Sequence, residues 1–391
     1  METFLNHNNI LLIMAIVNEN KIKINVGKVQ NKISKKMEIF YNPTMKFNRD
    51  SSIILLNSLQ KKKMIIGMPL SGSGIRGLRF LKELKKGIIN EIYFNDYKED
   101  FELILKKSLR LNKIKKDNNK IIISKKDANL FILENNGFSY IEVDPFGSPN
   151  PFLDSAVRRI SREGVLAITA TDTSALAGTY PKACARKYFA KPLRNYLMHE
   201  IGLRILIRKI QLIGAQYEKA LVPIFSYSKD HYYRIFFRSE KGKKKVDEVL
   251  KQHQYFLIDK KLKFEASKFN SKEKESLKER KEYAGPLWIG KLFDDKLIRN
   301  MKKEKYTKVI GIENKEDVKF FEMLCEETKV DILGFYDIPE IMKRYKIKDG
   351  IKLDKLTEKL KKNKFKVART HLSKQGIKTD ASIEDVVKVM N

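Results

Sequence analysis

Cysteine is almost absent from the sequence, which has only Cys184 and Cys325 among 391 residues. Two thiols exclude a framework of disulfides and any zinc site built from four cysteines of this chain, and they fit a reducing compartment. Histidine is scarce as well: the five are His7, His199, His231, His253 and His371. None of them shares a short ligand spacing with another histidine or a cysteine, so we expect no bound metal.

Long apolar runs are also missing. The stretch Ile10–Val17 is too short to cross a bilayer, and no other stretch approaches the roughly 18 apolar residues that a membrane-spanning helix needs. We therefore expect no membrane partner and a soluble, cytoplasmic protein.

Acidic residues are outnumbered, because 48 aspartates and glutamates stand against 80 lysines and arginines, for a formal charge of +32. A positive field of this size suits a polyanion, so nucleic acid is the leading partner. The alternative is that the lysine-rich composition reflects base bias in the genome or adaptation to heat, with lysines spread over a solvated surface. Charge alone does not decide between the two.

Length and composition predict two folded domains, since 391 residues are many for one domain and 42% hydrophobic residues suffice for packed cores. From Lys61 to Asp172, short β-branched runs alternate with amphipathic helical stretches. This pattern predicts a doubly wound α/β fold, in which crossover helices join parallel strands. The expected strands are Met64–Met68, Ile88–Asp96, Ile121–Ser124, Phe138–Asp144 and Val165–Asp172. Helices are expected to begin near Ile75, Tyr97, Ala128 and Phe152, and Gly87, Gly137 and Gly164 are expected to close helices.

The pattern changes near residue 218, where we place the boundary between a first domain, 1–218, and a second, 219–391. A helical pattern from Arg194 to about Tyr217 precedes the boundary. Hairpin-like strands, a lysine-rich linker at Lys268–Lys281, and short helices and strands follow it, so the second domain is predicted to be α+β. Its first expected strands are Ala220–Tyr227, Tyr232–Arg238 and Tyr255–Phe264.

A glycine-rich turn follows the first predicted strand. Gly72, Gly74 and Gly77 lie where a helix begins, and side chains at these positions would keep a nucleotide-bearing cofactor away from the loop. Asp96 ends the next strand about 20 residues further on, where a carboxylate can accept hydrogen bonds from ribose hydroxyls. The two features suit S-adenosylmethionine and a nicotinamide dinucleotide equally, so an oxidoreductase stays open.

Asp144-Pro145-Phe146-Gly147 ends the fourth predicted strand, at the sheet edge where such folds bind ligands. The Asp144 carboxylate can accept a hydrogen bond from an exocyclic amine and draw off its proton charge as an N–methyl bond forms. The Pro145 carbonyl can accept the second amine hydrogen, and the Phe146 ring can stack on a flipped base. The alternative is an ordinary strand-end turn, because Asp-Pro and Phe-Gly both form turns. Position and chemistry together favour methyl transfer to a base amine over a turn, over an oxidoreductase and over a non-catalytic RNA-binding protein that merely retains the fold.

With these motifs the sequence resembles the archaeal and eukaryotic tRNA (guanine(26)-N2)-dimethyltransferases. The matching segments run in order along nearly the whole chain. They include Phe40-Tyr41-Asn42-Pro43, Asn48-Arg49-Asp50, Ser71 to Gly77, Asn95-Asp96, Asp127-Ala128, Asp144 to Pro149, Thr169 to Asp172, Pro181, Ala183-Cys184, Arg186-Lys187-Tyr188, Lys229 to Tyr232, Gly285 to Gly290, Arg369-Thr370-His371 and Gly376 to Ala381.

The resemblance implies a class I S-adenosylmethionine-dependent methyltransferase domain, Rossmann-like, that makes N2-methyl- and N2,N2-dimethylguanosine in tRNA, followed by a domain that helps to hold tRNA. Asp144 would be the catalytic carboxylate, with Phe146 beside the base. The residues that would contact S-adenosylmethionine are Arg49, Arg76, Asp96, Asp127 and Ala128. Without the resemblance, Arg49 could simply pair with Asp50, and Asp127 could be a helix N-cap.

The sequence departs from its relatives at two places. Met68 stands where relatives carry an acidic residue at the end of the first strand, which puts one cofactor contact in doubt. Some relatives carry a cysteine cluster ahead of the Gly-Pro-Leu-Trp segment, where this chain has Ala284, so no structural zinc is expected.

Phosphate contacts to tRNA are expected from the basic surface of the second domain. The residues considered for them are lysines in and beyond the linker, together with Lys229, Arg234, Arg369 and Lys378. Further residues that either touch tRNA or bond within the domain are His231, Tyr232, Tyr233 and His371.

Overall fold

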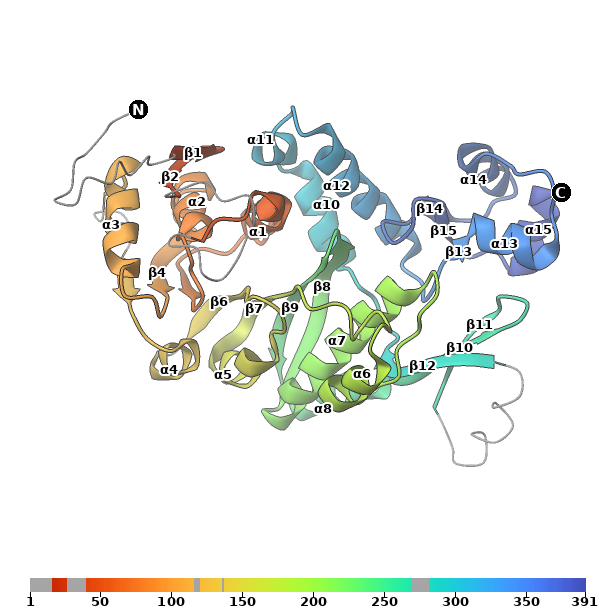
Figure 1. Ribbon diagram of the computed structural model, residues 1–391, viewed down its shortest axis with the longest axis horizontal. Helices are drawn as coiled ribbons and strands as arrows, with labels where there is room; N and C mark the ends of the chain where they lie inside the picture. Colours follow the sequence, from red (N-terminus) through yellow and green to blue (C-terminus); the bar gives the residue numbers. More distant parts are fainter. Residues whose placement is uncertain (1–15, 27–39, 116–119, 136, 269–280) are drawn as a thin grey trace, which may run out of the picture. The chain divides into compact units, whose positions relative to one another are not determined.

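The computed structural model describes residues 16–26, 40–115, 120–135, 137–268 and 281–391 (Figure 1). It divides into two compact units: a first unit of Met1–Ile168 with Asn300–Val318, and a second unit of Thr169–Arg299 with Lys319–Asn391. Compactness does not say where functions divide, so the domain boundary near residue 218 stays a prediction. His7, most of the Ile10–Val17 stretch and nearly all of the Lys268–Lys281 linker lie outside the described residues.

The first unit is built on parallel strands in the order β5-β4-β3-β6-β7. Figure 1 shows α1 and α2 on one side of these strands and α4 and α5 on the other. Ile66, Ile92, Ile141 and Leu166 have no exposed surface, because helices cover both faces of the strands. The predicted doubly wound α/β fold is therefore confirmed. Its elements are β1 (Ile16–Glu19), β2 (Ile22–Asn25), η1 (Pro43–Met45), α1 (Lys46–Ser58), β3 (Met64–Met68), α2 (Ile75–Glu83), β4 (Ile89–Asn95), α3 (Phe101–Leu111), β5 (Lys120–Ser124), α4 (Ala128–Glu134), β6 (Phe138–Val143), η3 (Asn150–Phe152), α5 (Leu153–Arg159), β7 (Ile160–Ala170) and α11 (Tyr306–Ile310).

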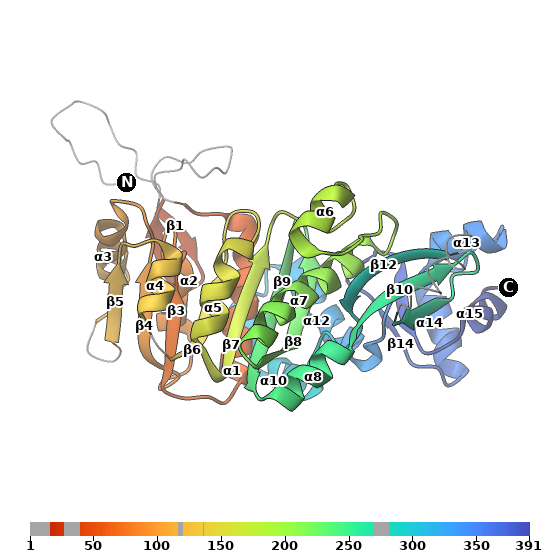
Figure 2. The ribbon, with the colours of Figure 1, turned by 90° about the horizontal axis from the view of Figure 1, so that it is seen from below.

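The second unit combines antiparallel strands with helices, as an α+β fold does. Strands β8 and β9 pair antiparallel over their whole length, β10 lies between β11 and β12, and β15 lies between β13 and β14. The long helix α7 packs on β8 and β12 (Figure 2). The elements are α6 (Pro181–Tyr188), α7 (Met198–Gln216), β8 (Lys219–Lys229), β9 (Tyr232–Lys241), α8 (Lys243–Lys251), β10 (His253–Asp259), β11 (Phe264–Ser267), β12 (Lys281–Trp288), α10 (Asp295–Lys303), α12 (Lys315–Glu327), η4 (Thr328–Val330), β13 (Tyr336–Asp337), α13 (Ile338–Tyr345), α14 (Leu353–Lys362), β14 (Val367–Arg369), β15 (Gly376–Thr379) and α15 (Ile383–Met390).

Two local predictions are wrong. Gly164 does not close a helix: α5 ends at Arg159, and Gly164 lies inside β7, where an added Cβ would come 2.9 Å from the Ser161 carbonyl oxygen. The strand expected at Tyr255–Phe264 is two strands, β10 and β11, that pair with each other. Leu262 turns the chain between them with φ of 61°, a conformation that apolar periodicity does not reveal.

A buried network of charges ties the β1–β2 hairpin to α1 and α2. Glu19, which is 3% exposed, accepts hydrogen bonds from Arg49 Nε at 2.7 Å and from Arg79 Nη1 at 2.9 Å. Arg79 also pairs with Asp50 at 2.6 Å and with Glu83 at 2.9 Å. Burial alone would raise the pKa of Glu19, but Arg49 and Arg79 outweigh it and lower that pKa to about 2. The carboxylate is therefore charged in the folded protein at every physiological pH.

Replacing Glu19 with Gln is expected to lower the free energy of unfolding by about 3 kcal/mol at pH 7, because two buried guanidinium groups lose their shared carboxylate. The Glu19 contribution is present above the unfolded pKa, near 4.5, and is lost as pH falls toward 2. The difference between variant and wild type in urea unfolding should therefore shrink below pH 4.5. Glu102→Gln, which removes an exposed ion pair with Lys106, is the control and should cost less than about 1 kcal/mol. A difference for Glu19→Gln that is constant from pH 7 to pH 2 would contradict the assignment.

Candidate active site

The candidate site lies at the carboxyl ends of β3 and β6. The chain runs outward from β3 through β4 to β5, then returns to β6 on the other side of β3 and continues to β7. Strands β3 and β6 pair parallel, with Ile66 opposite Tyr140. The loops after β3 and β6 consequently leave in opposite directions, and this change of direction is where open α/β sheets bind their ligands.

The glycine-rich turn joins β3 to α2, as predicted. Gly72 and Gly74 have φ of 55° and 75°, which side-chain-bearing residues rarely adopt. A Cβ on Gly74 would lie 2.5 Å from Leu105, and one on Gly77 would lie 2.2 Å from Phe94 of β4. Packing of α2 against α3 and β4 thus requires glycine at positions 74 and 77, whether or not a ligand is bound. Cofactor access, the role predicted for all three glycines, is therefore not the sole reason for glycine at positions 74 and 77.

Asp96 lies directly beyond β4 and holds the glycine-rich turn in place. One carboxylate oxygen accepts the backbone N–H of Gly72 at 2.8 Å, and the other accepts that of Lys98 at 3.3 Å. The residue is 8% exposed. A carboxylate in this position, beside the turn that opens α2, can accept hydrogen bonds from ribose hydroxyls.

The side chain of Asn95, which is fully buried, joins the loops that follow β3, β4 and β5. Its amide nitrogen donates to the Pro69 and Lys126 carbonyl oxygens, both at 3.0 Å. Its amide oxygen accepts the Lys126 N–H at 3.0 Å and the Ser124 hydroxyl at 2.9 Å. One amide therefore fixes the spacing between the glycine-rich turn, Asp96 and the start of α4.

Asp127 is the N-cap of α4. Its carboxylate accepts the N–H groups of Asn129 at 2.9 Å and Leu130 at 3.1 Å, while the side chain stays exposed. The capping alternative weighed for this residue is thus the contact seen within the chain. Ala128 is 5% exposed and takes the first position of α4, where helix N–H groups have no acceptor inside the helix.

Arg76 and Asp144 form an ion pair that links α2 to the end of β6. The Arg76 guanidinium also donates to Asn48 Oδ1 at 2.8 Å, to the Asn48 carbonyl at 3.2 Å and to the Ser52 hydroxyl at 3.0 Å, all on α1. Arg76 is 6% exposed, whereas the Asp144 side chain is 20% exposed. The carboxylate is therefore held in orientation from behind and is still accessible from outside.

Glu142 is a second carboxylate beside the same guanidinium. Its Oε2 lies 3.7 Å from Arg76 Nη1 and accepts the Tyr140 hydroxyl at 2.5 Å. Glu142 is 3% exposed, so it faces the protein, while Asp144, two residues later on the same side of the strand, lies at the edge. The single guanidinium is shared by a buried and an accessible carboxylate.

Phe146 carries its ring next to the glycine-rich turn. The side chain is 40% exposed and makes an edge-on contact with Phe40, with ring centroids 4.3 Å apart. The Phe40 carbonyl accepts the backbone N–H of Ser73 at 3.2 Å, which fastens this aromatic pair to the turn. An exposed ring in a fixed orientation can stack on a planar base.

The remaining predicted positions differ in their surroundings. Arg49 is bound to Glu19 and to the Asn42 carbonyl rather than to Asp50, which instead pairs with Lys46 and Arg79. Met68 is 3% exposed, and its sulfur would lie 2.8 Å from a Cβ on Gly77. At that position this chain has an apolar contact under α2 in place of a carboxylate.

Sequence reasoning missed Asn48, Ser52 and Glu142 around Arg76, and the role of the Asn95 amide. Two of them left a signal, because Asn48 adjoins Arg49 in a motif already singled out, and Glu142 is the one acidic residue of the segment Phe138–Val143, two positions before Asp144. A carboxylate that is buried in a sheet needs a cation beside it, so Glu142 indicates a buried cation on the same face as Asp144.

Two of the residues considered for phosphate contacts are buried in the second unit. Lys378 has no exposed surface and pairs with Glu200 at 3.2 Å, and Arg234, also fully buried, donates to the Thr169 hydroxyl at 2.9 Å. They cannot reach a phosphate, so these two interpretations are wrong. Arg369 is exposed, and Lys229 is half-buried over the Phe320 ring.

Within the described ranges, no helix is both long enough and apolar enough to cross a membrane. In the same part of the chain, histidine, cysteine and carboxylate side chains do not gather in groups of three that could hold a metal ion. The expectation of a metal-free protein stays a prediction.

Comparison with known proteins agrees with this geometry. A family model described as N2,N2-dimethylguanosine tRNA methyltransferase matches residues 20–391. A tRNA (guanine(26)-N(2))-dimethyltransferase of Pyrococcus furiosus is 40% identical over 387 residues, covering 96% of this chain and 97% of that protein. A tRNA (guanine(26)-N(2)/guanine(27)-N(2))-dimethyltransferase of Aquifex aeolicus is 37% identical, covering 96% of each.

A solved structure, described as Trm1 from Pyrococcus horikoshii with S-adenosyl-L-methionine, has a TM-score of 0.82 and 35% identity, covering 97% of this chain and all of that one. Identity at this level extends through both units. The resemblance drawn from the motifs is confirmed, and the chain belongs to the N2,N2-dimethylguanosine tRNA methyltransferase family.

Proposed function

We propose that this protein transfers methyl groups from S-adenosylmethionine to the N2 amine of a guanine in tRNA, at the position, 26, that the names of its relatives give. The observation that carries the proposal is the accessible Asp144 carboxylate, fixed by Arg76 beside the exposed Phe146 ring. Membership of a methyltransferase family argues against the oxidoreductase alternative. A tRNA substrate also fits the cytoplasmic location expected from the sequence.

The residues present fit S-adenosylmethionine. The Asp96 carboxylate can accept hydrogen bonds from ribose hydroxyls next to the turn that opens α2. Asp127 can accept the adenine amine, and the N–H of Ala128, at the start of α4, can donate to a ring nitrogen. Arg76 and Arg49 supply positive charge on the side of α1, suited to the carboxylate of the methionine moiety. When bound, this group supplies an electrophilic methyl.

Asp144 is proposed as the catalytic carboxylate. It accepts a hydrogen bond from the guanine N2 amine, which turns the nitrogen lone pair toward the methyl group, and it takes the proton that the nitrogen loses. Arg76 keeps the carboxylate in one orientation, because three further hydrogen bonds fix its own guanidinium to α1. Phe146 holds the base plane by stacking.

The tRNA itself is proposed to be held partly by the second unit, through exposed cations that contact phosphates. A truncation near residue 218 is a poor test of that role, because Asn300–Val318 belong to the first unit. Lys46 donates to the Ile310 carbonyl at 2.6 Å, and Lys85 pairs with Glu304 at 2.6 Å. Point variants on the intact chain are therefore preferable.

Incubation of the protein with S-adenosylmethionine and an unmodified tRNA transcript, followed by nucleoside mass spectrometry, tests the proposal directly. We expect N2-methyl- and N2,N2-dimethylguanosine, and their loss when the target guanine is replaced by adenine. A transcript that returns only unmodified guanosine, or methyl groups on another base, would refute it.

Asp144→Asn is expected to lower kcat by about 10²- to 10⁴-fold, since the shape survives while the proton acceptor is lost. The dissociation constant for S-adenosylmethionine, measured by calorimetry, should stay within a few-fold of wild type. Asp154→Asn, an exposed carboxylate of α5, is the matched control and should keep full activity. Turnover of Asp144→Asn close to wild type would remove Asp144 from the mechanism.

Asp96→Ala is expected to weaken S-adenosylmethionine binding about 10- to 100-fold, because a charged acceptor is lost and the Gly72 N–H loses its partner. Affinity for tRNA should change little. Asp96→Asn retains an oxygen for the Gly72 N–H and should therefore have an intermediate effect. An unchanged cofactor dissociation constant in Asp96→Ala would rule out the ribose contact.

A further inference from the structure

Helix α6 and the residues at its two ends form a strongly basic surface of the second unit. Between Asp172 and Glu200 the chain has no acidic residue, and it carries five basic ones. All five side chains are exposed: Lys182, Arg186, Lys187, Lys191 and Arg194. We call this stretch, from Tyr180 to Arg194, the α6 surface.

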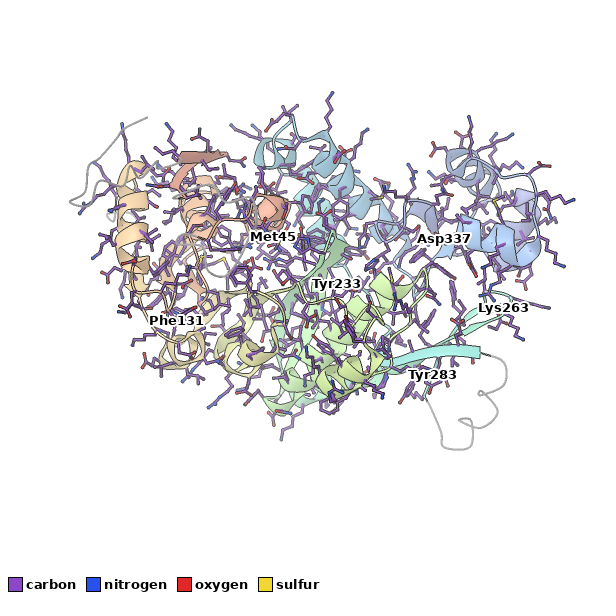
Figure 3. The ribbon with its side chains drawn as sticks, in the orientation of Figure 1. Met45, Phe131, Tyr233, Lys263, Tyr283 and Asp337 are labelled. Carbon is purple, nitrogen blue, oxygen red and sulfur yellow. The ribbon has the colours of Figure 1, made fainter. Side chains whose placement is uncertain are left out.

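The α6 surface is held by a firm scaffold. Cys184 and Tyr188 have no exposed surface and form the buried side of the helix, which packs on α7, as Figures 1 and 2 agree. Just past the helix, Lys191 and Gly285 of β12 exchange both backbone hydrogen bonds at 2.8 Å. The Lys191 ammonium lies 3.5 Å from the ring centre of Tyr283, which Figure 3 labels on β12. The charged side of α6 is thus presented outward on a fixed backbone.

Few of these cations are neutralised within the chain. Lys187 pairs with Asp172 at 3.0 Å. For Lys182, Arg186 and Arg194, no acidic side chain of the described ranges lies within ion-pair distance. Exposed cations without internal partners repel one another, so their grouping lowers the stability of the free protein and favours binding of a polyanion.

Aromatic residues hold both ends of α6, in positions where other residue types would stabilise the fold better. Tyr180 is the N-cap, is 61% exposed and makes no capping hydrogen bond, whereas Ser, Thr, Asp or Asn would cap the helix. Phe189 ends the helix with φ of 52°, a left-handed conformation that favours glycine, and is 64% exposed. Neither ring gains much from burial, so each carries a cost that folding does not explain.

Exposed rings among unpaired cations are what single-stranded RNA requires. Bases stack on aromatic faces, while Lys and Arg contact the phosphates between them. An acidic protein would use the cations but has no need for two exposed rings. A cation–π contact from Lys209, 5.0 Å from the ring centre of Phe189, holds that ring from one side and leaves most of it open.

We propose that the α6 surface binds an unpaired segment of the tRNA substrate, with the Phe189 and Tyr180 rings stacking on bases and Lys182, Arg186 and Arg194 contacting phosphates. This assignment rests on the proposed function for the identity of the RNA. It adds a binding surface to the second unit that is separate from the residues of the candidate active site.

The position of Phe189 allows a test in which stability and binding change in opposite directions. Phe189→Gly removes the ring and relieves the left-handed backbone, so we expect Tm to rise and tRNA affinity to fall about 5- to 100-fold, the loss of one stacked base. Phe189→Trp keeps a stacking face and should keep the affinity. Binding is measured by fluorescence anisotropy with an unmodified tRNA transcript.

Lys346→Gly is the matched control, since Lys346 ends the equally long helix α13 with φ of 55° and is also exposed. It should raise Tm in the same way and leave tRNA affinity within about two-fold, since at most one phosphate contact is altered. A Phe189→Gly protein that binds tRNA like wild type, or whose Tm falls, would overturn the assignment.

The phosphate contacts are tested by salt dependence. Lys182→Gln combined with Arg186→Gln should lower the slope of log affinity against log salt by about one for each phosphate that is no longer neutralised, whereas Phe189→Gly should leave the slope unchanged. An unchanged slope in the double variant would overturn the phosphate contacts.

Methyl transfer separates this inference from the proposed function. At saturating tRNA all these variants should keep the wild-type kcat, with a raised KM for tRNA only. Wild-type protein that binds tRNA but makes no methylguanosine would refute the proposed function and leave the binding comparison valid. Wild-type activity with an unchanged KM in every α6 variant would refute the inference alone.

Discussion

The candidate site depends on the ion pair between the Arg76 guanidinium and the Asp144 carboxylate. The guanidinium belongs to α2, takes two acceptors from Asn48 and one from Ser52 on α1, and pairs with Asp144 beyond β6. A guanidinium offers five donors in a rigid plane, so it can fix several acceptors at once without moving. An ion pair this well enclosed adds little to stability, because desolvation offsets much of the attraction. Its value is that the one carboxylate left accessible has a single orientation before any substrate arrives.

Packing constrains the same place from the other side. Gly77 lets α2 approach Phe94, and Gly74 lets the turn pass Leu105, so the helix that carries Arg76 lies close to the sheet. Asn95 then joins the three loops in which the glycine-rich turn, Asp96 and Asp127 lie. Cofactor and base residues thus share a backbone that van der Waals contacts and one buried amide hold in place. The glycines serve the fold first, and the access they give to a ligand follows from it.

Sequence patterns predicted the parts of the fold whose causes are local. Strand β3 and the starts of α2 and α4 were placed at the residues where they are found, because β-branched runs, glycine and a capping aspartate act over a few positions. The break at Leu262 and the burial of Lys378 depend on partners far along the chain, and no local signal carries them. Arg49 illustrates the same limit: its neighbour Asp50 was the obvious partner in sequence, yet Glu19, 30 residues away, took it. The roles of the site residues were inferred from family motifs, and they stay proposals until variants are measured.

Residues that oppose folding can indicate a function outside the folded chain. Among the described helices, Ser382 and Asp385 form a capping box at α15, and Asp127 and Asp337 cap α4 and α13, whereas others, such as α1 and α7, have no side-chain cap. Helix α6 differs from these helices in carrying an exposed aromatic ring in each capping position, Tyr180 and Phe189. Two rings that stay in water at the ends of one helix, one of them on a left-handed backbone, point to a contact made outside the folded chain. In an RNA-modifying enzyme with a charge of +32, many surface lysines can attract the substrate, whereas exposed rings add stacking faces that an unstacked base can use and a phosphate cannot.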